Sequence, residues 1–238
     1  MSIHVISAWY NEEYLAPFFL EHYRYADMVT VLVDDLTDDN TIEICKRYGV
    51  DVRMVRYSND SSMDEWKKAC MLSDLYRASG YEYVVNVDAD EYVFGGRGEV
   101  ESGYDIRVVK LWQVYRHADE QDLDLRVSVR EQRRHGVYVW PYSKPVVVRT
   151  GQDLRWYSGN HSVRVNGHHE VWRHPEENVG HYGPEMTGAH WVMADPAFCI
   201  ARRLTRKVRH YHTGKYGELT SDMLAAECML HQNDPKLW

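Results

Sequence analysis

The stretch Tyr81–Glu91, with the sequence YEYVVNVDADE, joins a mostly apolar and aromatic run to a group of carboxylates. The run predicts a strand that other elements cover on both faces. Asp88, Asp90 and Glu91 follow it, and carboxylates this close together repel one another unless a cation lies between them. Two of them at i and i+2 can converge on one hard ion such as Mg²⁺ or Mn²⁺. The alternative interpretation is an acidic turn that caps a helix.

The chain before this stretch alternates short apolar runs with amphipathic ones, as parallel α/β units do. In open sheets of this kind, ligands bind at the carboxyl ends of the strands. Three of those ends carry polar clusters, at Asn11–Glu13, Asp34–Asp39 and Asp88–Glu91. We therefore expect an α/β fold with a mainly parallel central sheet and helices on both faces. Strands are predicted at residues 3–8, 29–33, 50–55 and 81–87, and helices at 12–25, 41–48 and 63–79.

The second half of the chain, which we separate from the first near residues 95–98, has weaker periodicity. At 238 residues the chain has the size of one large α/β domain. We expect a single domain over 1–238, with a nucleotide-binding half at 1–95 and an acceptor-side half at 96–238. Strands are predicted at 106–111, 137–139 and 145–149, site-forming loops at 156–190, and a helix with five basic side chains at 197–210.

The bulk composition narrows the choice of partners and location. A formal charge of −8 gives no global positive field, so nonspecific binding of nucleic acid is not expected. The four cysteines are widely spaced and form no zinc or disulfide pattern. The chain opens on a strand-like run and holds no apolar run of about 18 residues, so neither a secretion signal nor a transmembrane segment is expected. We expect a cytoplasmic protein, with peripheral attachment to a membrane left open.

Three stretches together resemble one enzyme family. Ser7–Glu13 (SAWYNEE) is similar to its opening strand and Asn-Glu turn, and Val33–Thr41 (VDDLTDDNT) aligns with its usual VDDGSTDGT segment. Asp88, Asp90 and Glu91 fall where its metal motif stands. The family is the family 2 glycosyltransferases of the GT-A fold, in a branch with a DxDE motif. The resemblance implies a GT-A (Rossmann-like) single domain, a UDP-linked sugar donor, Mn²⁺ or Mg²⁺ as cofactor, and inversion at the transferred sugar.

The same resemblance implies roles for residues of the first two polar clusters. The turn that ends at Asn11, together with Asp34 or Asp35, would hold the base and the ribose of the nucleotide. An acidic side chain at a strand end can accept a hydrogen bond from a uracil N–H or a ribose hydroxyl. Asp38 and Asp39 are expected instead to cap the helix that follows them.

The resemblance also implies how the metal and the diphosphate are held. Asp90 would be the direct metal ligand, and Asp88 would contribute to both metal and nucleotide binding. In the segment Arg202–Lys215 a basic helical face is followed by His212, which we choose to complete the metal shell or to donate to a phosphate oxygen. This segment would close over the donor. The alternative is a solvated basic helix. The face consists of Arg202, Arg206 and Arg209.

No pattern identifies the base that deprotonates the acceptor. In the family it is usually a carboxylate after the strands of the second half, and the common Glu-Asp pair is missing here. Lys144 precedes a predicted strand and could face an anionic group, but a solvated lysine on an edge strand is the favoured interpretation. The weak candidates for the base, which nothing ranks, are Asp119, Glu120, Asp195 and His161.

Six histidines within thirty residues leave a different interpretation open, since imidazole is the common ligand of zinc and iron. No HExxH or fixed His/Cys spacing accompanies them, so most are expected to form hydrogen bonds within loops. His161 could coordinate a metal, donate to a phosphate or hold a loop. The six are His161, His168, His169, His174, His181 and His190.

The sequence therefore predicts a metal-dependent glycosyltransferase that moves a sugar from a nucleotide donor to an acceptor hydroxyl. The acceptor stays open among a glycan, a lipid-linked glycan, a protein and a modified DNA base. Two other classes compete: a noncatalytic sugar-nucleotide or glycan-binding module, and a histidine-based metalloprotein. A binding remnant has no need of an intact Asp88, Asp90 and Glu91 set. Zinc or iron retained through purification would favour the metalloprotein, whereas weak Mg²⁺ or Mn²⁺ binding that needs nucleotide would favour the transferase.

Overall fold

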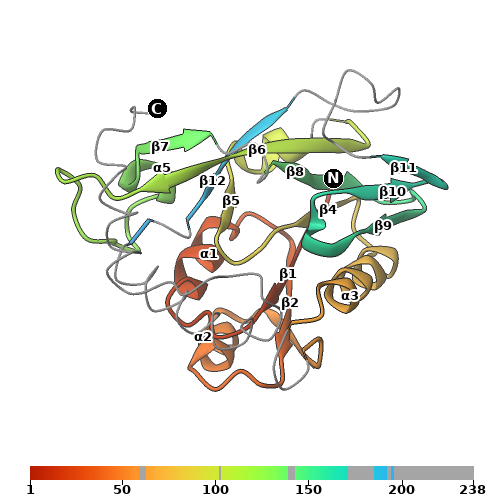
Figure 1. Ribbon diagram of the computed structural model, residues 1–238, viewed down its shortest axis with the longest axis horizontal. Coiled ribbons are helices and arrows are strands. Elements are labelled where there is room, and N and C mark those ends of the chain that lie inside the picture. Colours follow the sequence, from red (N-terminus) through yellow and green to blue (C-terminus); the bar gives the residue numbers. More distant parts are fainter. Residues whose placement is uncertain (59–62, 102, 139–142, 171–184, 192–193, 196–238) are drawn as a thin grey trace, which may run out of the picture.

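The computed structural model describes residues 1–58, 63–101, 103–138, 143–170, 185–191 and 194–195 (Figure 1). None of the helices in these ranges is long and apolar enough to cross a membrane. In chain order the elements are β1 (Ile3–Trp9), α1 (Ala16–His22), β2 (Met28–Asp34), α2 (Thr41–Tyr48), β3 (Asp51–Val55), α3 (Glu65–Arg77), β4 (Tyr83–Asn86), β5 (Glu91–Val93), α4 (Gly96–Val100), β6 (Ile106–Tyr115), α5 (Val129–Gln132), β7 (His135–Tyr138), β8 (Lys144–Arg149), β9 (Leu154–Trp156), the 3₁₀ turn η2 (Ser158–Asn160), β10 (Val163–Val165), β11 (His168–Glu170) and β12 (Met186–His190).

A nine-stranded sheet forms the centre of the described chain. Its order is β3-β2-β1-β4-β8-β6-β12-β5, with β7 paired to β6. The strands β3, β2, β1 and β4 are parallel neighbours, and β6 and β12 run in the same direction as these four. Only β8, β5 and β7, among the described strands of this sheet, run the opposite way. The predicted α/β class with a mainly parallel central sheet is therefore confirmed.

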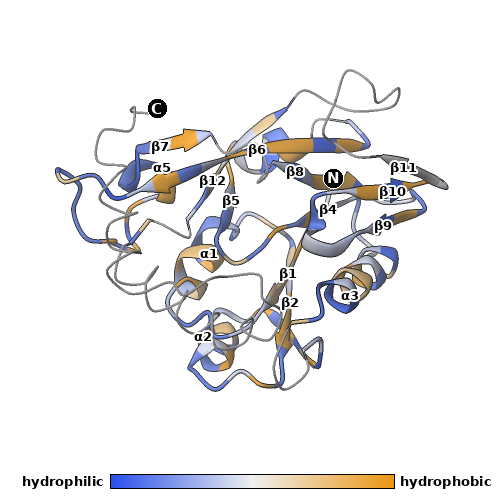
Figure 2. Cartoon of the chain, viewed as in Figure 1, coloured by the Kyte–Doolittle hydropathy of each residue, from blue (hydrophilic) through white to orange (hydrophobic). Residues whose placement is uncertain are grey.

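Alternate side chains of the central strands point into two separate cores. On one face Val5 of β1 belongs to a buried cluster with Phe19 of α1 and Ile44 of α2. On the other face its neighbour Ile6 belongs to a cluster with Leu72 of α3. Figure 1 shows α1 and α2 on one side of β1 and β2 and α3 on the other, and Figure 2 shows these strands to be mostly hydrophobic. Helices thus cover both faces, which is why the strands are apolar without alternation.

Local signals set the ends of the first-half helices. The Asp64 carboxylate accepts a hydrogen bond from the Lys67 backbone N–H at 2.9 Å and so caps the start of α3. The helix α2 ends at Gly49, whose φ of 69° lies in the left-handed region that glycine adopts without strain. The predicted helix at 12–25 is shorter in the structure and begins at Ala16, with Pro17 in its first turn.

The prediction of loops over residues 156–190 is wrong in part. The strands β9, β10 and β11 form a small antiparallel sheet, and β12 enters the main sheet between β6 and β5. These strands are three to five residues long, too short to show a period in the sequence. In β12, a Cβ built on Gly188 would lie 2.6 Å from the Tyr92 carbonyl oxygen. The strand therefore needs a glycine, which in sequence is typical of a turn.

His4, which is 5% exposed in β1, should make the stability of the fold depend on pH. Burial lowers the pKa of His4 to about 4, with Arg53 acting in the same direction. The unfolded chain then binds more protons than the native state between pH 6.5 and 4, so stability is complete above pH 6.5 and falls as the pH drops toward 4. The loss amounts to at most about 3 kcal/mol.

Urea unfolding at pH 7 and pH 4.5 measures this contribution. His4→Gln keeps a polar side chain for the partners of His4, the hydroxyls of Thr30 at 2.8 Å and Ser79 at 3.1 Å, but does not titrate. The wild type should lose more stability on acidification than His4→Gln, because all other groups are shared. Equal losses in the two proteins would show that His4 carries no such effect.

Candidate metal and nucleotide site

The three predicted polar clusters lie at one edge of the sheet. Because β2, β1 and β4 are parallel neighbours, the segments that follow them leave the sheet on the same side. Asn11 follows β1, Asp34 closes β2 and Asp88 follows β4. The topology thus brings the predicted residues to a common edge, and their contact with a nucleotide stays a prediction.

Asn11 ties the first two of these segments together. Its Nδ2 donates to Asp38 Oδ1 at 2.6 Å, and its Oδ1 accepts from the Asp38 backbone N–H at 3.0 Å. Its φ of 51° lies in the left-handed region, which asparagine tolerates better than most residues. Asp39 Oδ1 accepts from the N–H of Thr41, the first residue of α2, at 2.9 Å. Asp39 therefore serves the start of α2 as expected, whereas Asp38 bonds Asn11 instead of the helix.

Asp34 and Asp35 differ in exposure. Asp34 is fully buried, its Oδ1 accepting from the Leu36 N–H at 3.1 Å and its Oδ2 from the Ser58 hydroxyl at 2.6 Å. The Asp35 side chain is 40% exposed and forms an ion pair with Arg56. The two carboxylates therefore have different tasks. Asp34 shapes the turn after β2, and Asp35 reaches solvent at the strand end.

Two buried lysines meet the carboxylates that follow β4. Lys144 Nζ, at the start of β8, lies 2.9 Å from Asp88 Oδ2 and 2.7 Å from Glu91 Oε1. Lys68 Nζ, on α3, lies 3.8 Å from Asp88 Oδ1. The side chains of Lys144 and Glu91 are 1% and 4% exposed, whereas that of Asp88 is 28% exposed. Asp88 is thus held between two cations and still reaches solvent. We call Asp88, Asp90 and Glu91 the acidic cluster.

The charged groups in and around the acidic cluster shift one another's pKa values. Burial would raise the pKa of Asp88, but Lys144 and Lys68 outweigh it and hold that pKa well below its usual range. At Glu91 burial dominates and raises the pKa despite Lys144. Burial would lower the pKa of Lys144, but Asp88 and Glu91 raise it overall. Asp88 and Lys144 therefore form a charged pair at neutral pH.

The position of Lys144 corrects the prediction of a solvated lysine on an edge strand. β8 lies inside the sheet between β4 and β6 and is antiparallel to both. The first residue of β8 therefore lies beside the last residues of β4, next to Asp88. The sequence pattern shows a strand here but not its neighbours. The less favoured interpretation, a lysine that faces an anionic group, is the one that the structure bears out.

Asp90 faces a histidine from β12. His190 Nε2 lies 3.5 Å from Asp90 Oδ2, and the two side chains are 11% and 3% exposed. His190 Nδ1 is hydrogen-bonded to Gln113 Oε1 at 2.8 Å, so this nitrogen carries a proton. When the only ring proton is on Nδ1, Nε2 presents a lone pair toward Asp90, and a cation between the two atoms would stabilise this arrangement. Sequence reasoning named His190 only among six histidines, because the pairing of β12 with β5 is not visible in the sequence.

His161 follows η2 and lies beside the same charges. Burial lowers the pKa of His161 to about 4, and Lys144 acts in the same direction. The ring is therefore neutral at pH 7, and its Nδ1 has no hydrogen-bond partner among the described residues. A base this weak is poorly matched to a sugar hydroxyl at neutral pH. His161 is better suited to donate or accept a hydrogen bond at the acidic cluster.

The other candidates for the base hold fixed partners. Glu120, 7% exposed, accepts from two backbone N–H groups, one of them that of His117 at 2.9 Å. Asp119 Oδ1 lies 2.5 Å from His117 Nδ1. Asp195 Oδ2 accepts from the Tyr14 hydroxyl at 2.8 Å. These contacts select no base among them, and the assignment stays open.

Several predicted residues lie outside the described ranges. These include His212 and the whole segment Arg202–Lys215, so their roles stay predictions. Of the six clustered histidines, the structure describes the side chains of His161 and His190.

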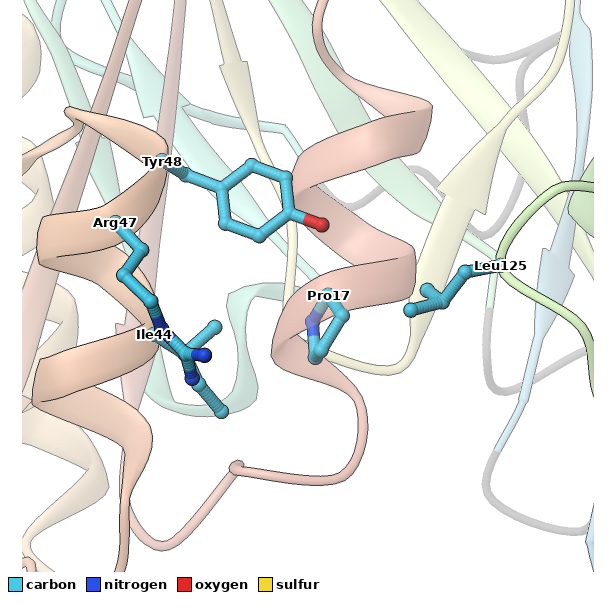
Figure 3. Close-up of a pocket in the computed structure, with 5 residues that line it drawn as sticks. All are labelled: Pro17, Ile44, Arg47, Tyr48 and Leu125. Atoms are coloured by element: carbon cyan, nitrogen blue, oxygen red, sulfur yellow. The ribbon is translucent and has the colours of Figure 1, made fainter.

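Two hollows of the described surface lie away from the acidic cluster. A hollow of about 260 Å³ lies between α1, α2 and the segment that carries Leu125 (Figure 3). A second, of about 860 Å³, extends along α1 and residues 121–126. Asp88 and Asp90 line neither of them, whereas Glu13, from the polar cluster after β1, lines the second. The first is lined by Pro17, Ile44, Arg47, Tyr48 and Leu125.

No protein-family model matches the chain, and no curated protein matches it by sequence. Solved structures of glucosyl-3-phosphoglycerate synthase from Mycobacterium tuberculosis are similar to part of it. The complex of that synthase with Mn²⁺, UDP and glucosyl-3-phosphoglycerate is 19% identical over 48% of this chain and 44% of that chain, with a TM-score of 0.33. Its complex with Mn²⁺ and UDP-glucose gives 19% identity, the same two shares and a TM-score of 0.34. The match spans less than half of the synthase chain, and a likeness this slight assigns no activity.

Proposed function

We propose that this protein is a metal-dependent glycosyltransferase that moves a sugar from a nucleoside-diphosphate donor, UDP-linked by preference, to an acceptor hydroxyl. The observation that supports this is the acidic cluster at the end of β4, in contact with Lys144 and beside the polar ends of β1 and β2. A site for such a donor needs polar groups for the nucleoside, basic groups for the diphosphate and acidic groups for a divalent cation, all close together. The first half of the chain would then be the nucleotide-binding half.

The side chains around Asp90 fit a divalent cation. Asp90 and His190 offer an oxygen and a nitrogen 3.5 Å apart, close to the roughly 3 Å between neighbouring ligands of an octahedral ion. A mixed oxygen and nitrogen set favours Mn²⁺ over Mg²⁺, which prefers oxygen alone. Mn²⁺ or Mg²⁺ bound there would supply positive charge beside the leaving diphosphate.

Lys144 and Lys68 would make the same surface acceptable to an anionic donor. Three carboxylates without cations would repel a diphosphate. The two ammonium groups offset this charge, and Lys144 fixes the orientation of Asp88 and Glu91 through its two short contacts. Because both lysines are almost fully buried, these orientations exist before the donor binds.

The stereochemistry and the acceptor are finer parts of the proposal. Inversion at the transferred sugar is supported by the resemblance of the three sequence stretches, and it requires a base on the face opposite the leaving group. We assign no residue to that base. The acceptor is a glycan, a lipid-linked glycan, a protein or a modified DNA base, used by a cytoplasmic or peripherally attached enzyme.

A donor screen tests the proposal before the acceptor is known. Purified protein is incubated with a panel of nucleotide sugars and Mn²⁺, and release of the nucleoside diphosphate is measured. Slow hydrolysis of one donor that stops with EDTA and in Asp88→Asn supports the transferase. Nucleotide binding without hydrolysis of any donor would favour the noncatalytic binding module instead. Absence of both hydrolysis and metal-dependent nucleotide binding would refute the proposal.

Asp35→Asn is expected to raise the Michaelis constant for the donor about tenfold and to leave turnover nearly unchanged. The reason is that the charged Asp35 carboxylate would accept a hydrogen bond from the nucleoside, far from the bond that breaks. Loss of this bond weakens donor binding but not the chemical step. Steady-state kinetics with varied donor measure both constants. Arg56→Gln is the matched control, since it removes the ion pair of Asp35 but keeps the carboxylate. Lower turnover with an unchanged Michaelis constant would place Asp35 at the reacting centre instead.

A further inference from the structure

We propose that His117, Asp119 and His135 form a second metal site, separate from the acidic cluster and specific for a first-row transition metal ion such as Zn²⁺. Each of the three side chains offers one ligand atom, and these atoms all lie within 4.8 Å of one another. Within the described ranges, no other group of three histidine, cysteine or acidic side chains converges in this way.

The backbone brings the two histidines together. β6 and β7 pair antiparallel with Tyr115 opposite His135, and His117 comes two residues after β6 ends. The buried Glu120 carboxylate accepts from the His117 N–H at 2.9 Å and from the Arg134 N–H at 2.8 Å. One side chain thus fixes both segments that carry a histidine.

Arg133 fixes the same region from within the core. Its side chain is 1% exposed, and its Nε donates to the Ala194 carbonyl oxygen at 2.6 Å. Its Nη1 donates to the Gln121 carbonyl oxygen at 3.0 Å. Charge-assisted hydrogen bonds of this kind are stronger than neutral ones and hold the backbone just before His135. Ligands on a fixed backbone lose less freedom when they bind an ion.

The three side chains already lie close together, and binding of a shared cation requires the two rings to turn so that a nitrogen of each faces the ion. The rings of His117 and His135 stack with centroids 4.3 Å apart and planes 18° apart. Both rings offer imidazole nitrogens, the commonest metal ligands in proteins. Asp119 Oδ1 lies 2.5 Å from His117 Nδ1, so the carboxylate is already beside one of the two rings.

The donor set decides the class of ion. Two imidazoles and one carboxylate suit Zn²⁺ and its neighbours, whereas Mg²⁺ prefers oxygen alone. Ligand atoms of tetrahedral zinc lie roughly 3.3 Å apart, so no pair of ligand atoms has to approach by more than about 1.5 Å. His117 Nδ1 and Asp119 Oδ1, which lie 2.5 Å apart, have to separate slightly. The Asp119 side chain is 65% exposed and has room for that movement. Solvent would take the fourth position.

The site gives two of the candidate bases other tasks. Asp119 becomes a metal ligand, and Glu120 a positioning residue that holds the segments of His117 and His135. Because β6 and β4 run in the same direction with β8 between them, this site and the acidic cluster lie at the same edge of the sheet. Zinc binding here does not depend on the proposed transferase activity.

Zinc titration of the full-length, tag-free and EDTA-treated protein tests the site. Calorimetry is done with excess Mg²⁺ and no nucleotide. The wild type is expected to bind one equivalent of Zn²⁺. His117→Ala and His135→Ala should each lower the affinity for this ion at least about 100-fold. Co²⁺ in place of Zn²⁺ should give a visible absorption band that both variants lose. Asp122→Asn removes a carboxylate that is 89% exposed and three residues from Asp119, and as the matched control it should bind like the wild type.

Unchanged zinc affinity and stoichiometry in both histidine variants would overturn the site. Loss of this zinc in His190→Ala, with His117→Ala unaffected, would assign the ion to the acidic cluster and also overturn it. His117→Gln and His135→Gln, checked by circular dichroism, separate loss of a ligand from loss of fold, because glutamine keeps a polar side chain of similar reach. Since no nucleotide is present, failure of this test leaves the donor screen untouched.

Discussion

The Asp90→Ala protein is expected to lose sugar transfer by about 10²–10³-fold or more and to remain folded. Asp90 would hold the cation beside the leaving diphosphate, so its loss removes charge stabilisation that exists mainly in the transition state. The fold should survive because Asp90 stands next to Asp88 and Glu91, and removal of one carboxylate relieves repulsion when no metal is bound. The thermal midpoint of the metal-free protein should stay equal or rise.

Kinetics and calorimetry measure the two sides of this prediction. Turnover of the donor is compared in the wild type, Asp90→Ala and Asp90→Asn, and the Asn variant keeps the volume of the side chain while removing its charge. Binding of UDP should need Mn²⁺ in the wild type and should lose that dependence in both variants. Wild-type turnover in Asp90→Ala, or full activity in excess EDTA, would refute the assignment of Asp90 as a ligand of a catalytic metal ion.

Lys144→Met is expected to destabilise the protein by about 3–5 kcal/mol, the cost of breaking a buried ion pair by removal of one partner. Methionine fills a similar volume, but it leaves Glu91 and Asp88 without the ammonium that lies 2.7 Å and 2.9 Å from them. Urea unfolding at pH 7 measures the loss. Lys110→Met is the matched control, since Lys110 is also on a strand and paired with Glu185 but is 42% exposed. It should cost less than about 1 kcal/mol.

A second substitution and added Mn²⁺ each test whether unpaired charge causes the loss of stability in Lys144→Met. Glu91→Gln in the same chain should recover part of the stability, because it removes the carboxylate that was left buried. Mn²⁺ should also stabilise Lys144→Met more than the wild type, since a cation can then meet carboxylates that the lysine no longer satisfies. Equal destabilisation by Lys144→Met and Lys110→Met would mean that the contacts of Lys144 contribute little.

The first half of the fold could be read from the sequence because its signals are local. The run before Asp88 is apolar on both faces, Gly49 ends a helix, and β1, β2 and β3 follow one another as parallel neighbours, with β4 on the other side of β1. The second half could not be read in the same way. The strands β8 and β12 enter the sheet between strands that lie far from them in sequence, and β12 contains Gly188, which is typical of a turn. Periodicity shows that a strand exists but not which strands it joins.

In the candidate site, too, the residues with a local sequence signal could be predicted and those brought in by tertiary packing could not. The acidic cluster was predicted from the sequence, because carboxylates at i and i+2 directly after an apolar strand are a local signal and the resemblance places a metal motif there. Its partners were not. Lys144 was interpreted as an edge lysine, Lys68 was not singled out, and His190 was one of six histidines. Each of them reaches the acidic cluster through tertiary packing that no local pattern records, and the same holds for the convergence of His117 with His135.

Lys144 meets Asp88 across 56 residues of chain. During synthesis the ribosome therefore delivers the acidic cluster well before β8, and before the strand that carries His190. β8 has to insert antiparallel between β4 and β6, and pairings at such sequence separation form more slowly than local contacts. A nascent chain that ends before β8 holds these carboxylates without their principal counter-charge. Competence to bind the proposed anionic donor would thus be acquired late in biogenesis, when the last strands of the sheet have docked.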